Sequence, residues 1–204
     1  MAQDPPFTAL PSRLRVAPAV GATRDQERLA RSGHRPALEA LLREHASAVL
    51  RLCHHVAGPA DGRDAAQEAL ERIVTGIARF DPERGAFRPW ALTVARNVCR
   101  DRLRRRGLER GAFVHDGHER SAAARASAAD PEQLALLRDD AEALERALAE
   151  LPENLRSALV LFHLHEASYE EIAQTLEVPI GTVMTWLHRG RKRLRSAMNA
   201  EEER

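Results

Sequence analysis

Residues 168–198, SYEEIAQTLEVPIGTVMTWLHRGRKRLRSAM, carry two helical patterns separated by a tight turn. Ser168, followed three residues later by Glu171, matches the capping box that opens a helix. The turn covers residues 177–181, and a longer basic helix is expected from Thr182 to about Met198. A short helix, a turn and a longer helix predict a helix-turn-helix unit.

The second helix of this unit has two chemically distinct faces. Val183, Leu187 and Leu194 lie on one arc of the helix, which can pack on the preceding helix. Residues 188–195 carry five basic side chains and no acid, whereas charges on a merely solvated face usually alternate in sign. This favours a DNA-recognition helix over an ordinary amphipathic helix. The expected DNA contacts are Thr182, Thr185, His188, Arg189, Lys192 and Arg193, while Trp186, at the edge of the apolar arc, either packs in the core or contacts DNA.

The composition of the whole chain favours helices. Of 204 residues, 44% are hydrophobic, 30% charged and only 4% aromatic, which disfavours a β-sandwich or β-barrel. No apolar run approaches the roughly 18 residues of a membrane span, and the N-terminal residues lack the apolar segment of a secretory signal. Two cysteines, Cys53 and Cys99, are too few for a disulfide framework and indicate buried, reduced thiols in a cytoplasmic protein.

The formal net charge of +1 hides a segregated pattern. Residues 96–110 carry seven Arg against two acids, and residues 188–195 carry five bases and no acid, so each segment has a local charge of +5. Residues 130–153 carry eight acids against two Arg, a local charge of −6. Two basic segments separated by an acidic one indicate two contacts with a polyanion such as DNA.

The periodicity divides the chain into four segments. We expect a mostly disordered tail over 1–36, with only a short helix near 25–31, and then a helical domain over 37–107 that ends at Gly107. Residues 108–131 lack apolar periodicity and predict a flexible linker. Residues 132–204 predict a second helical domain that ends in the helix-turn-helix unit. The expected fold class is therefore all-α: two small helical domains joined by a flexible linker, with helices near 38–56, 64–79, 87–106, 134–148 and 153–165.

Aromatic residues cluster around the basic helix of the first domain. Phe80, Phe87 and Trp90 lie at or just before the Arg-rich segment. Aromatic and Arg side chains beside a loop can hold an unstacked base by stacking and cation–π contact. The alternative for Trp90 is ordinary packing in the core, and the pattern leaves both open.

Ordered motifs in the two domains resemble the extracytoplasmic-function (ECF) sigma factors of the sigma-70 family. In the first domain they are DAAQEAL (64–70), FDP (80–82), FRPW (87–90), ARN (95–97) and DRLRRR (101–106), which resemble sigma region 2. In the second domain LP (151–152), SYEEIA (168–173), GTV (181–183) and LHR (187–189) resemble region 4. The order and spacing of the motifs make the set specific.

The resemblance implies a role for each domain. Region 2 would dock on the β′ clamp helices of core RNA polymerase and read the minus-ten promoter element, and region 4 would meet the β flap and read the minus-thirty-five element as duplex DNA. The implied polymerase contacts are Asp64, Gln67, Glu68 and Glu71. The implied DNA contacts of region 2 are Phe87, Arg88, Trp90, Arg96, Asn97, Arg100 and Arg104. Glu177 and the segment 184–186 depart from the family pattern, so a family-average promoter preference is not carried over.

The expected function is therefore that of a sigma factor that directs promoter-specific transcription initiation, monomeric when free and controlled by an anti-sigma protein. Two alternatives remain. A stand-alone helix-turn-helix regulator would bind DNA without polymerase, and a helical adaptor would bind no DNA. The first leaves residues 61–106 without a role, and the second leaves both basic segments without one.

No catalytic site, cofactor site or metal site is expected. No nucleophile–base pair, carboxylate dyad or phosphate-binding Gly loop stands out. Cys53, His54, His55 and Cys99 show no paired zinc spacing, and adjacent residues such as His54 and His55 point to different sides of a helix.

Overall fold

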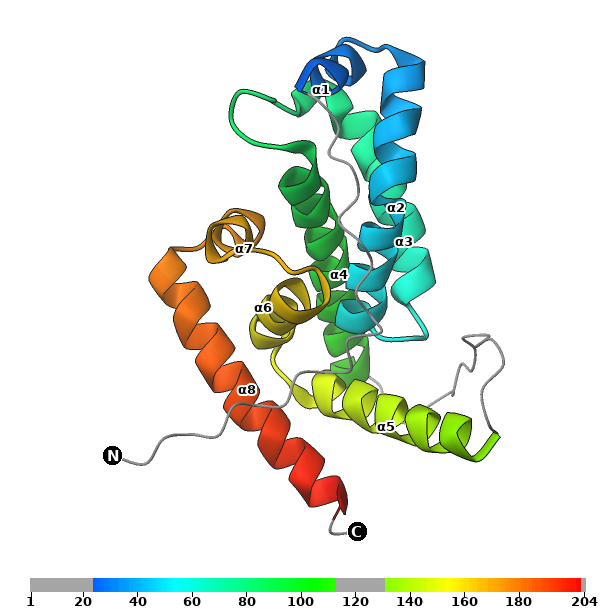
Figure 1. The fold of residues 1–204 in the computed structure, drawn as a ribbon, viewed down its shortest axis with the longest axis vertical. Coiled ribbons are helices and arrows are strands. Elements are labelled where there is room, and N and C mark those ends of the chain that lie inside the picture. Colours follow the sequence, from blue (N-terminus) through cyan, green and yellow to red (C-terminus); the bar gives the residue numbers. More distant parts are fainter. Residues whose placement is uncertain (1–23, 113–130, 203–204) are drawn as a thin grey trace.

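A computed structural model of the chain describes residues 24–112 and 131–202, and the side chains of residues 24–107 and 141–199. Within these ranges the chain forms eight α-helices and one 3-10 turn, with no strand (Figure 1). The predicted all-α class is confirmed, as is the helix-turn-helix at the C-terminal end of the described residues.

The N-terminal module contains α1 (Arg24–Arg31), α2 (Arg35–Ala57), α3 (Gly62–Gly76), η2 (Ile77–Arg79) and α4 (Phe87–Ala112). Helices α2, α3 and α4 pack on one another. Their apolar positions recur at three- and four-residue steps, so each helix buries one stripe. The fully buried side chains of this core include Leu41, Val49, Leu52, Ile73, Phe87 and Val98. Cys53 and Cys99 are buried free thiols in the same core, and their mutual hydrogen bond, followed by burial, raises the pKa of Cys99.

Helix α1 lies within the segment that the sequence predicts to be mostly disordered. It packs on α2, Ala30 is completely buried, and the Glu27 carboxylate accepts a 2.8 Å hydrogen bond from the Phe87 N–H at the start of α4. Glu27 therefore satisfies one of the free amide groups that every helix start exposes. The short helix expected near 25–31 is confirmed as α1. Disorder was expected for residues 32–36, but they form the turn after α1 and the start of α2, and residues 1–23 lie outside the described residues.

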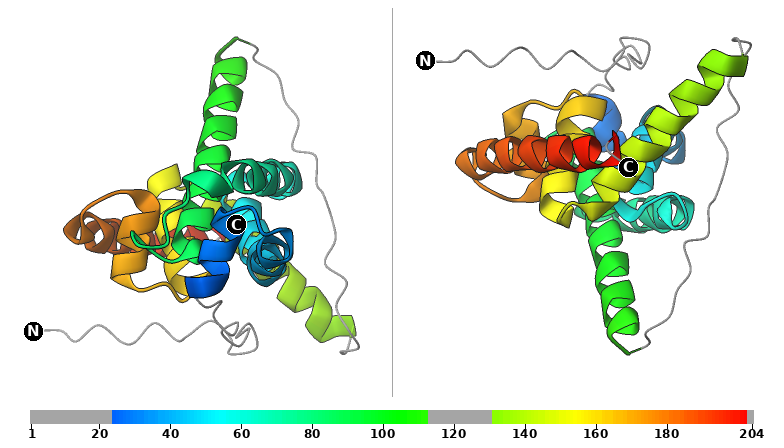
Figure 2. Two further views of the ribbon diagram at one scale, coloured as in Figure 1. Left: turned by 90° about the horizontal axis from the view of Figure 1, so that it is seen from above. Right: turned by 90° about the horizontal axis from the view of Figure 1, so that it is seen from below.

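Helix α4 continues past Gly107 to Ala112, so the predicted stop at Gly107 is wrong. A glycine costs a helix only about 1 kcal/mol relative to alanine, and the flanking Arg, Leu and Glu residues are strong helix formers. The last turns of α4 project away from the packed helices (Figure 2). Residues 108–112 of the expected linker are thus helical, and residues 113–130 lie outside the described residues.

The C-terminal module contains α5 (Pro131–Glu150), α6 (Glu153–Leu164), α7 (Tyr169–Leu176) and α8 (Ile180–Glu202). Helix α6 is its centre: every residue from 155 to 161 is buried. Helices α5, α7 and α8 all contact either α6 or each other. Gly190 of α8 sits directly against Leu159 of α6, where an added Cβ would lie 3.0 Å from the leucine side chain.

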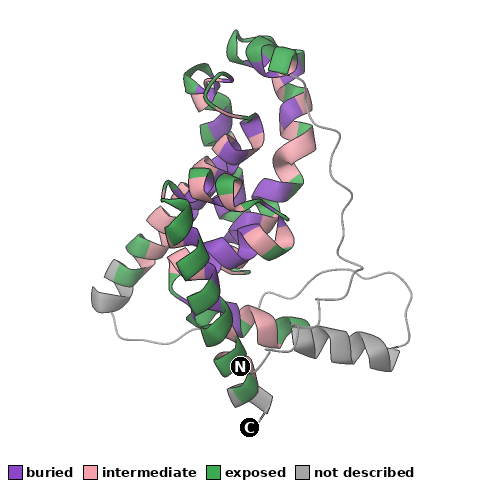
Figure 3. Cartoon of the chain, turned by 60° about the vertical axis from the view of Figure 1, so that its left-hand side comes forward, coloured by how far each residue is buried: buried purple, intermediate pink, exposed green. Residues whose placement is uncertain are grey.

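The two modules pack against each other. Helices α5 and α6 contact α2, and α7 contacts α4. Figure 3 shows buried residues where the two modules meet and exposed residues along α8. One apolar core extends through both modules, from Leu41 and Val98 to Leu161 and Leu187. The expected linker therefore joins domains that share a core rather than two separate bodies.

Arg156 of α6 stabilises the contact between the two modules. Its side chain is only 7% exposed, and it donates hydrogen bonds to the carbonyl oxygens of Val56 (2.6 Å), Ala149 (2.7 Å) and Leu151 (2.9 Å). The last carbonyl groups of a helix lack partners within that helix. One guanidinium group therefore caps α2 and the end of α5 together.

Candidate polymerase and nucleic-acid interfaces

The four residues predicted to contact polymerase lie on α3. Asp64, Gln67 and Glu71 are exposed, and the Gln67 amide donates to the Glu71 carboxylate at 3.2 Å. Glu68 is half-buried and forms ion pairs with Arg72 (2.6 Å) and Arg102 (2.8 Å). Burial by itself would raise the pKa of Glu68, but the hydrogen bonds and charges of Arg102 and Arg72 lower it overall. Glu68 thus links α3 to α4 through its ion pairs. The other three side chains, Asp64, Gln67 and Glu71, form an exposed polar row on α3.

An apolar groove runs beside this row, between α2 and α3. Leu50 and Val74 line it and are 47% and 42% exposed, which is high for large aliphatic side chains. Exposed apolar residues rimmed by polar ones mark interaction surfaces. The other lining residues are Ala46, Ser47, Arg63, Ala66, Gln67, Leu70, Glu71 and Thr75. Sequence reasoning missed Leu50 and Val74, although both are apolar residues outside the buried stripe of their helix, and that signal could have identified them.

The aromatic cluster around the start of α4 is a packing cluster. Phe80, Phe87 and Trp90 contact one another with ring centroids 5.2–5.7 Å apart. Phe87 is 1% exposed, so it offers no ring face to a base in this structure, and its predicted role in DNA contact stays a prediction. Trp90 is half-buried and packs between Phe80 and Phe87, which favours the core alternative.

Two of the Arg residues predicted to contact DNA face the C-terminal module. Arg96 donates to both carboxylate oxygens of Glu153, at 2.8 and 3.1 Å. Arg88 donates to the His165 carbonyl oxygen at 2.6 Å and lies 3.8 Å from the Glu171 carboxylate. The structure thus pairs both side chains with the other module.

The remaining candidates on α4 are more varied. Arg104 is exposed on the projecting part of the helix. Asn97 and Arg100 are half-buried, and Asn97 Oδ1 and Arg100 Nε are buried without a hydrogen-bond partner among the described residues. Unsatisfied buried polar atoms are rare in native structures.

The recognition helix of the helix-turn-helix is positioned by its two neighbours. Ser168 and Glu171 form the predicted capping box at the start of α7. Glu177 ends α7 in the left-handed conformation (φ 56°), and the Val178 N–H donates to the Ala173 carbonyl oxygen, as in a Schellman ending. Val183 and Leu187 of α8 are fully buried, and Trp186 packs at the edge of the core.

The outer face of α8 presents the predicted DNA contacts. Thr182 is half-buried, and Thr185, His188, Arg189, Lys192 and Arg193 are exposed. No acid within the described residues pairs with Arg189, Lys192 or Arg193, so their charges are available to phosphate groups. Arg191 instead lies over the Phe162 ring, 5.0 Å from its centre. Met184, 54% exposed, and Ile180, 42% exposed, add apolar surface beside the basic face.

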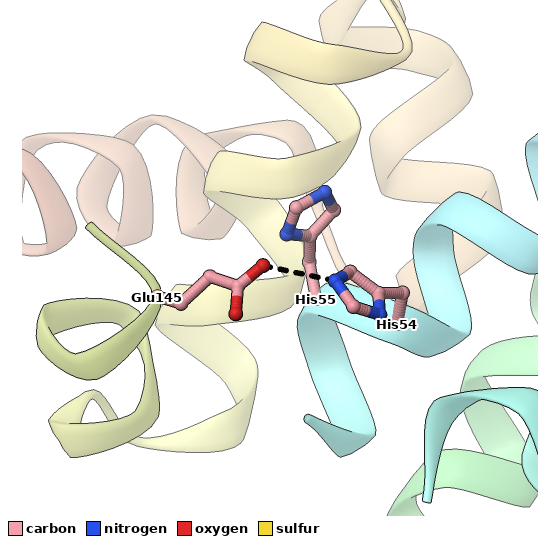
Figure 4. Close-up of side chains that lie close together, drawn as sticks. All are labelled: His54, His55 and Glu145. Carbon is pink, nitrogen blue, oxygen red and sulfur yellow. Dashed lines mark hydrogen bonds and ion pairs between the residues drawn. The ribbon is translucent and has the colours of Figure 1, made fainter. Parts of the chain in front are cut away.

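One cluster could hold a metal ion. His54 and His55 of α2 and Glu145 of α5 bring three donor atoms within 4.8 Å of one another (Figure 4). His54 Nε2 and Glu145 Oε1 are 2.9 Å apart. Burial, and secondarily the charge of His54, lowers the pKa of His55 to about 4, so this imidazole is neutral near pH 7.

The comparisons with known proteins agree with this geometry. Residues 41–109 match the family described as Sigma-70 region 2, and residues 141–194 match Sigma-70, region 4. The chain is 34% identical to the ECF RNA polymerase sigma factor SigE of Mycolicibacterium smegmatis over 78% of this chain, and the match spans 61% of that protein. It is 30% identical to the ECF RNA polymerase sigma factor SigW of Bacillus subtilis, over 74% of this chain and 82% of SigW.

Two solved structures share the fold. CnrH, solved in complex with the cytosolic domain of CnrY, superposes with a TM-score of 0.63 at 22% identity, covering 87% of this chain and 97% of CnrH. The sigma factor RpoE of Bartonella quintana, solved with the anti-sigma factor NepR, gives a TM-score of 0.65 at 22% identity, covering 79% of this chain and 96% of RpoE.

The fold and the two matched regions define a transcription initiation factor of the sigma-70 type. The chain belongs to the ECF RNA polymerase sigma factors. No helix within the described ranges is long and apolar enough to span a membrane.

Proposed function

We propose that this chain binds core RNA polymerase through the groove and polar row between α2 and α3, and directs it to promoters through α4 and α8. The observation that carries the proposal is the pairing of two unlike surfaces on one chain. The N-terminal module exposes an apolar groove bordered by Gln67 and Glu71, which suits a protein partner. The C-terminal module exposes a basic face on α8 whose Arg189, Lys192 and Arg193 have no acidic partner within the described residues, and this suits duplex DNA.

In this mechanism the chain supplies recognition and the polymerase supplies the chemistry. Helix α8 places Arg189, Lys192 and Arg193 against the upstream duplex. Helix α4 meets the region of strand opening through Arg96, Asn97, Arg100 and Arg104. Before Arg88 and Arg96 can contact DNA, they must leave their partners in the C-terminal module. The protein acts in the cytoplasm and is held inactive by an anti-sigma partner, as RpoE is solved with NepR.

A run-off transcription assay with core polymerase tests the proposal. Promoter-specific initiation is expected only when this protein is added. Tight and specific duplex binding without any dependence on polymerase would support a stand-alone regulator instead.

Charge reversal tests the polymerase surface. Asp64→Arg combined with Glu71→Arg should abolish polymerase pull-down while circular dichroism stays helical, because both side chains are exposed and neither holds the fold together. Glu68 is left intact in this test because it pairs with Arg72 and Arg102. Glu39→Arg, on the exposed face of α2, is the matched control and should bind polymerase like the wild type. If polymerase pulls down the double variant as well as the wild type, Asp64 and Glu71 are not part of the polymerase-binding surface.

A further inference from the structure

Three potential metal ligands meet where the two modules touch. His54 and His55 lie in the last turns of α2, and Glu145 lies on α5 of the other module (Figure 4). Their nearest donor atoms all lie within 4.8 Å of one another, and His54 Nε2 is already 2.9 Å from Glu145 Oε1. Residues 91 positions apart are thus brought together by the packing of α5 on α2.

The backbone around these donors is held firmly. Arg156 binds the carbonyl oxygens of Val56, close behind the two histidines, and of Ala149, one turn beyond Glu145. On the other side of α2, Gly62 approaches so closely that an added Cβ would lie 2.5 Å from His54 Cα. The two helix segments that carry the donors are therefore held in place relative to each other.

An ordinary hydrogen bond accounts for only part of the cluster. The contact between His54 and Glu145 satisfies one nitrogen and one oxygen. His55 Nδ1 is buried and has no hydrogen-bond partner among the described residues. Its ring stands edge-on to that of His54, with centroids 5.0 Å apart. A buried polar atom without a partner is costly, and a cation among the three groups would give it one.

The donor set indicates the class of ion. Two imidazoles and one carboxylate are ligands that zinc takes in proteins, with a fourth position left to water. Calcium and magnesium prefer oxygen ligands throughout. Zinc–ligand distances of about 2.1 Å need donor atoms about 3.3 Å apart. The donors here lie within 4.8 Å of one another, so side-chain rotations that move them by about 1.5 Å would close the site.

We propose that His54, His55 and Glu145 form a zinc-class metal site that joins α2 of the N-terminal module to α5 of the C-terminal module. This departs from the expectation drawn from the sequence, which considered ligand spacing along the chain and had no means of adding Glu145. A bound ion would hold the modules together and keep Arg88 and Arg96 turned toward the C-terminal module. This regulatory consequence rests on the proposed function, whereas metal binding itself does not.

Metal titration of the purified, chelator-treated full chain tests the site without polymerase or DNA. Calorimetry with Zn²⁺ should give one equivalent, and Co²⁺ should give the visible absorption bands of a four-coordinate ion. Glu145→Gln, His54→Asn and His55→Asn should each weaken binding by at least about tenfold. The controls are Glu142→Gln on the exposed face of α5 and His163→Asn, exposed outside the cluster, which should both bind like the wild type.

The outcomes separate the possibilities. Zinc should raise the melting temperature of the wild type more than that of Glu145→Gln, because an ion that binds only the folded state stabilises it in proportion to how tightly it binds. No binding by the wild type, or equal binding by Glu145→Gln, would overturn the bridging site. Circular dichroism checks that each variant is folded, and the two histidine variants keep the test decisive if Glu145→Gln is not.

A transcription assay then tests the consequence. Zinc should reduce run-off transcription with the wild type more than with Glu145→Gln, using the same polymerase preparation. Equal inhibition, or none, in a wild type that binds zinc would overturn the regulatory role and leave the metal site standing. Failure of zinc binding would leave the proposed sigma function untouched.

Discussion

Arg96 on α4 forms a two-point ion pair with Glu153 on α6, at 2.8 and 3.1 Å. Arg96 is 6% exposed and its partner carboxylate about 20% exposed at the side chain, so the pair is mostly shielded from water. Ser157 completes the arrangement by donating to the same carboxylate at 2.8 Å. Since Arg96 is also a candidate DNA contact, the same guanidinium group would have two mutually exclusive partners. DNA binding by this side chain then requires the modules to separate.

Glu153→Gln should destabilise the protein by about 2 kcal/mol, because it leaves the Arg96 charge buried without its anionic partner. Urea unfolding followed by circular dichroism measures this. The control is Glu39→Gln, which removes an exposed partner of Arg35 and should change stability by less than about 0.5 kcal/mol. Equal midpoints for the two variants would show that the Arg96 pair contributes no more than a surface ion pair.

The helices could be predicted from the sequence because each buries a single stripe with helical period, and capping residues such as Ser168 mark their starts. The contact between the two modules could not be predicted from the sequence. Arg96 and Arg156 are polar residues in basic or mixed segments, and an Arg that faces a partner module has the same local pattern as one that faces solvent. Their partners lie 57 and 100 residues away in the chain.

The candidate interfaces, too, could be predicted from the sequence only in part. The basic face of α8 follows from the helical wheel alone, and its predicted residues are exposed, apart from the half-buried Thr182. The burial of Phe87 does not follow from the sequence, because aromatic residues beside a basic helix are equally typical of a core and of a base-stacking surface. Leu50 and Val74 were missed because a groove depends on how two helices pack, which no single helix reveals.

His165 makes stability depend on pH. It is 4% exposed, neither ring nitrogen has a hydrogen-bond partner among the described residues, and burial, followed by the charges of Arg51, Arg88 and His55, lowers its pKa to about 3. The unfolded chain, with a pKa near 6.5, therefore takes up the proton first as the pH falls. The stability that neutral His165 contributes is complete above about pH 7 and is lost at about 1.4 kcal/mol per pH unit below 6.5, down to about pH 3.

The measurement is the change in unfolding free energy between pH 7 and pH 5. His165→Leu should make that change smaller by about 2 kcal/mol. His188→Leu, at an exposed position on α8, is the control. An identical pH dependence in His165→Leu and the wild type would mean that His165 takes up its proton at the same pH in the folded and the unfolded chain.

Glu177→Gly should stabilise the protein by about 0.5–1 kcal/mol. Glu177 adopts φ 56° and ψ 45° at the end of α7, a conformation that costs residues with a Cβ about 1 kcal/mol and costs glycine little. Part of the gain is offset because glycine makes the unfolded chain more flexible. Glu170→Gly, inside α7, should have the opposite sign and destabilise by about 1 kcal/mol. A lower melting temperature for Glu177→Gly would show that the glutamate side chain contributes more than its backbone costs.

Arg189→Ala combined with Lys192→Ala should weaken binding to duplex DNA and flatten its salt dependence. Both side chains are exposed on α8 and have no acidic partner within the described residues, so each is free to neutralise a phosphate group. Each lost phosphate contact should reduce the slope of log affinity against log salt by about 0.9, and the double variant by about 1.8. Fluorescence anisotropy over a salt series measures the slope. Arg43→Ala, exposed on α2 of the other module, should leave the slope unchanged. If the double variant keeps the wild-type slope, neither side chain touches the DNA backbone, and the basic face of α8 has another partner.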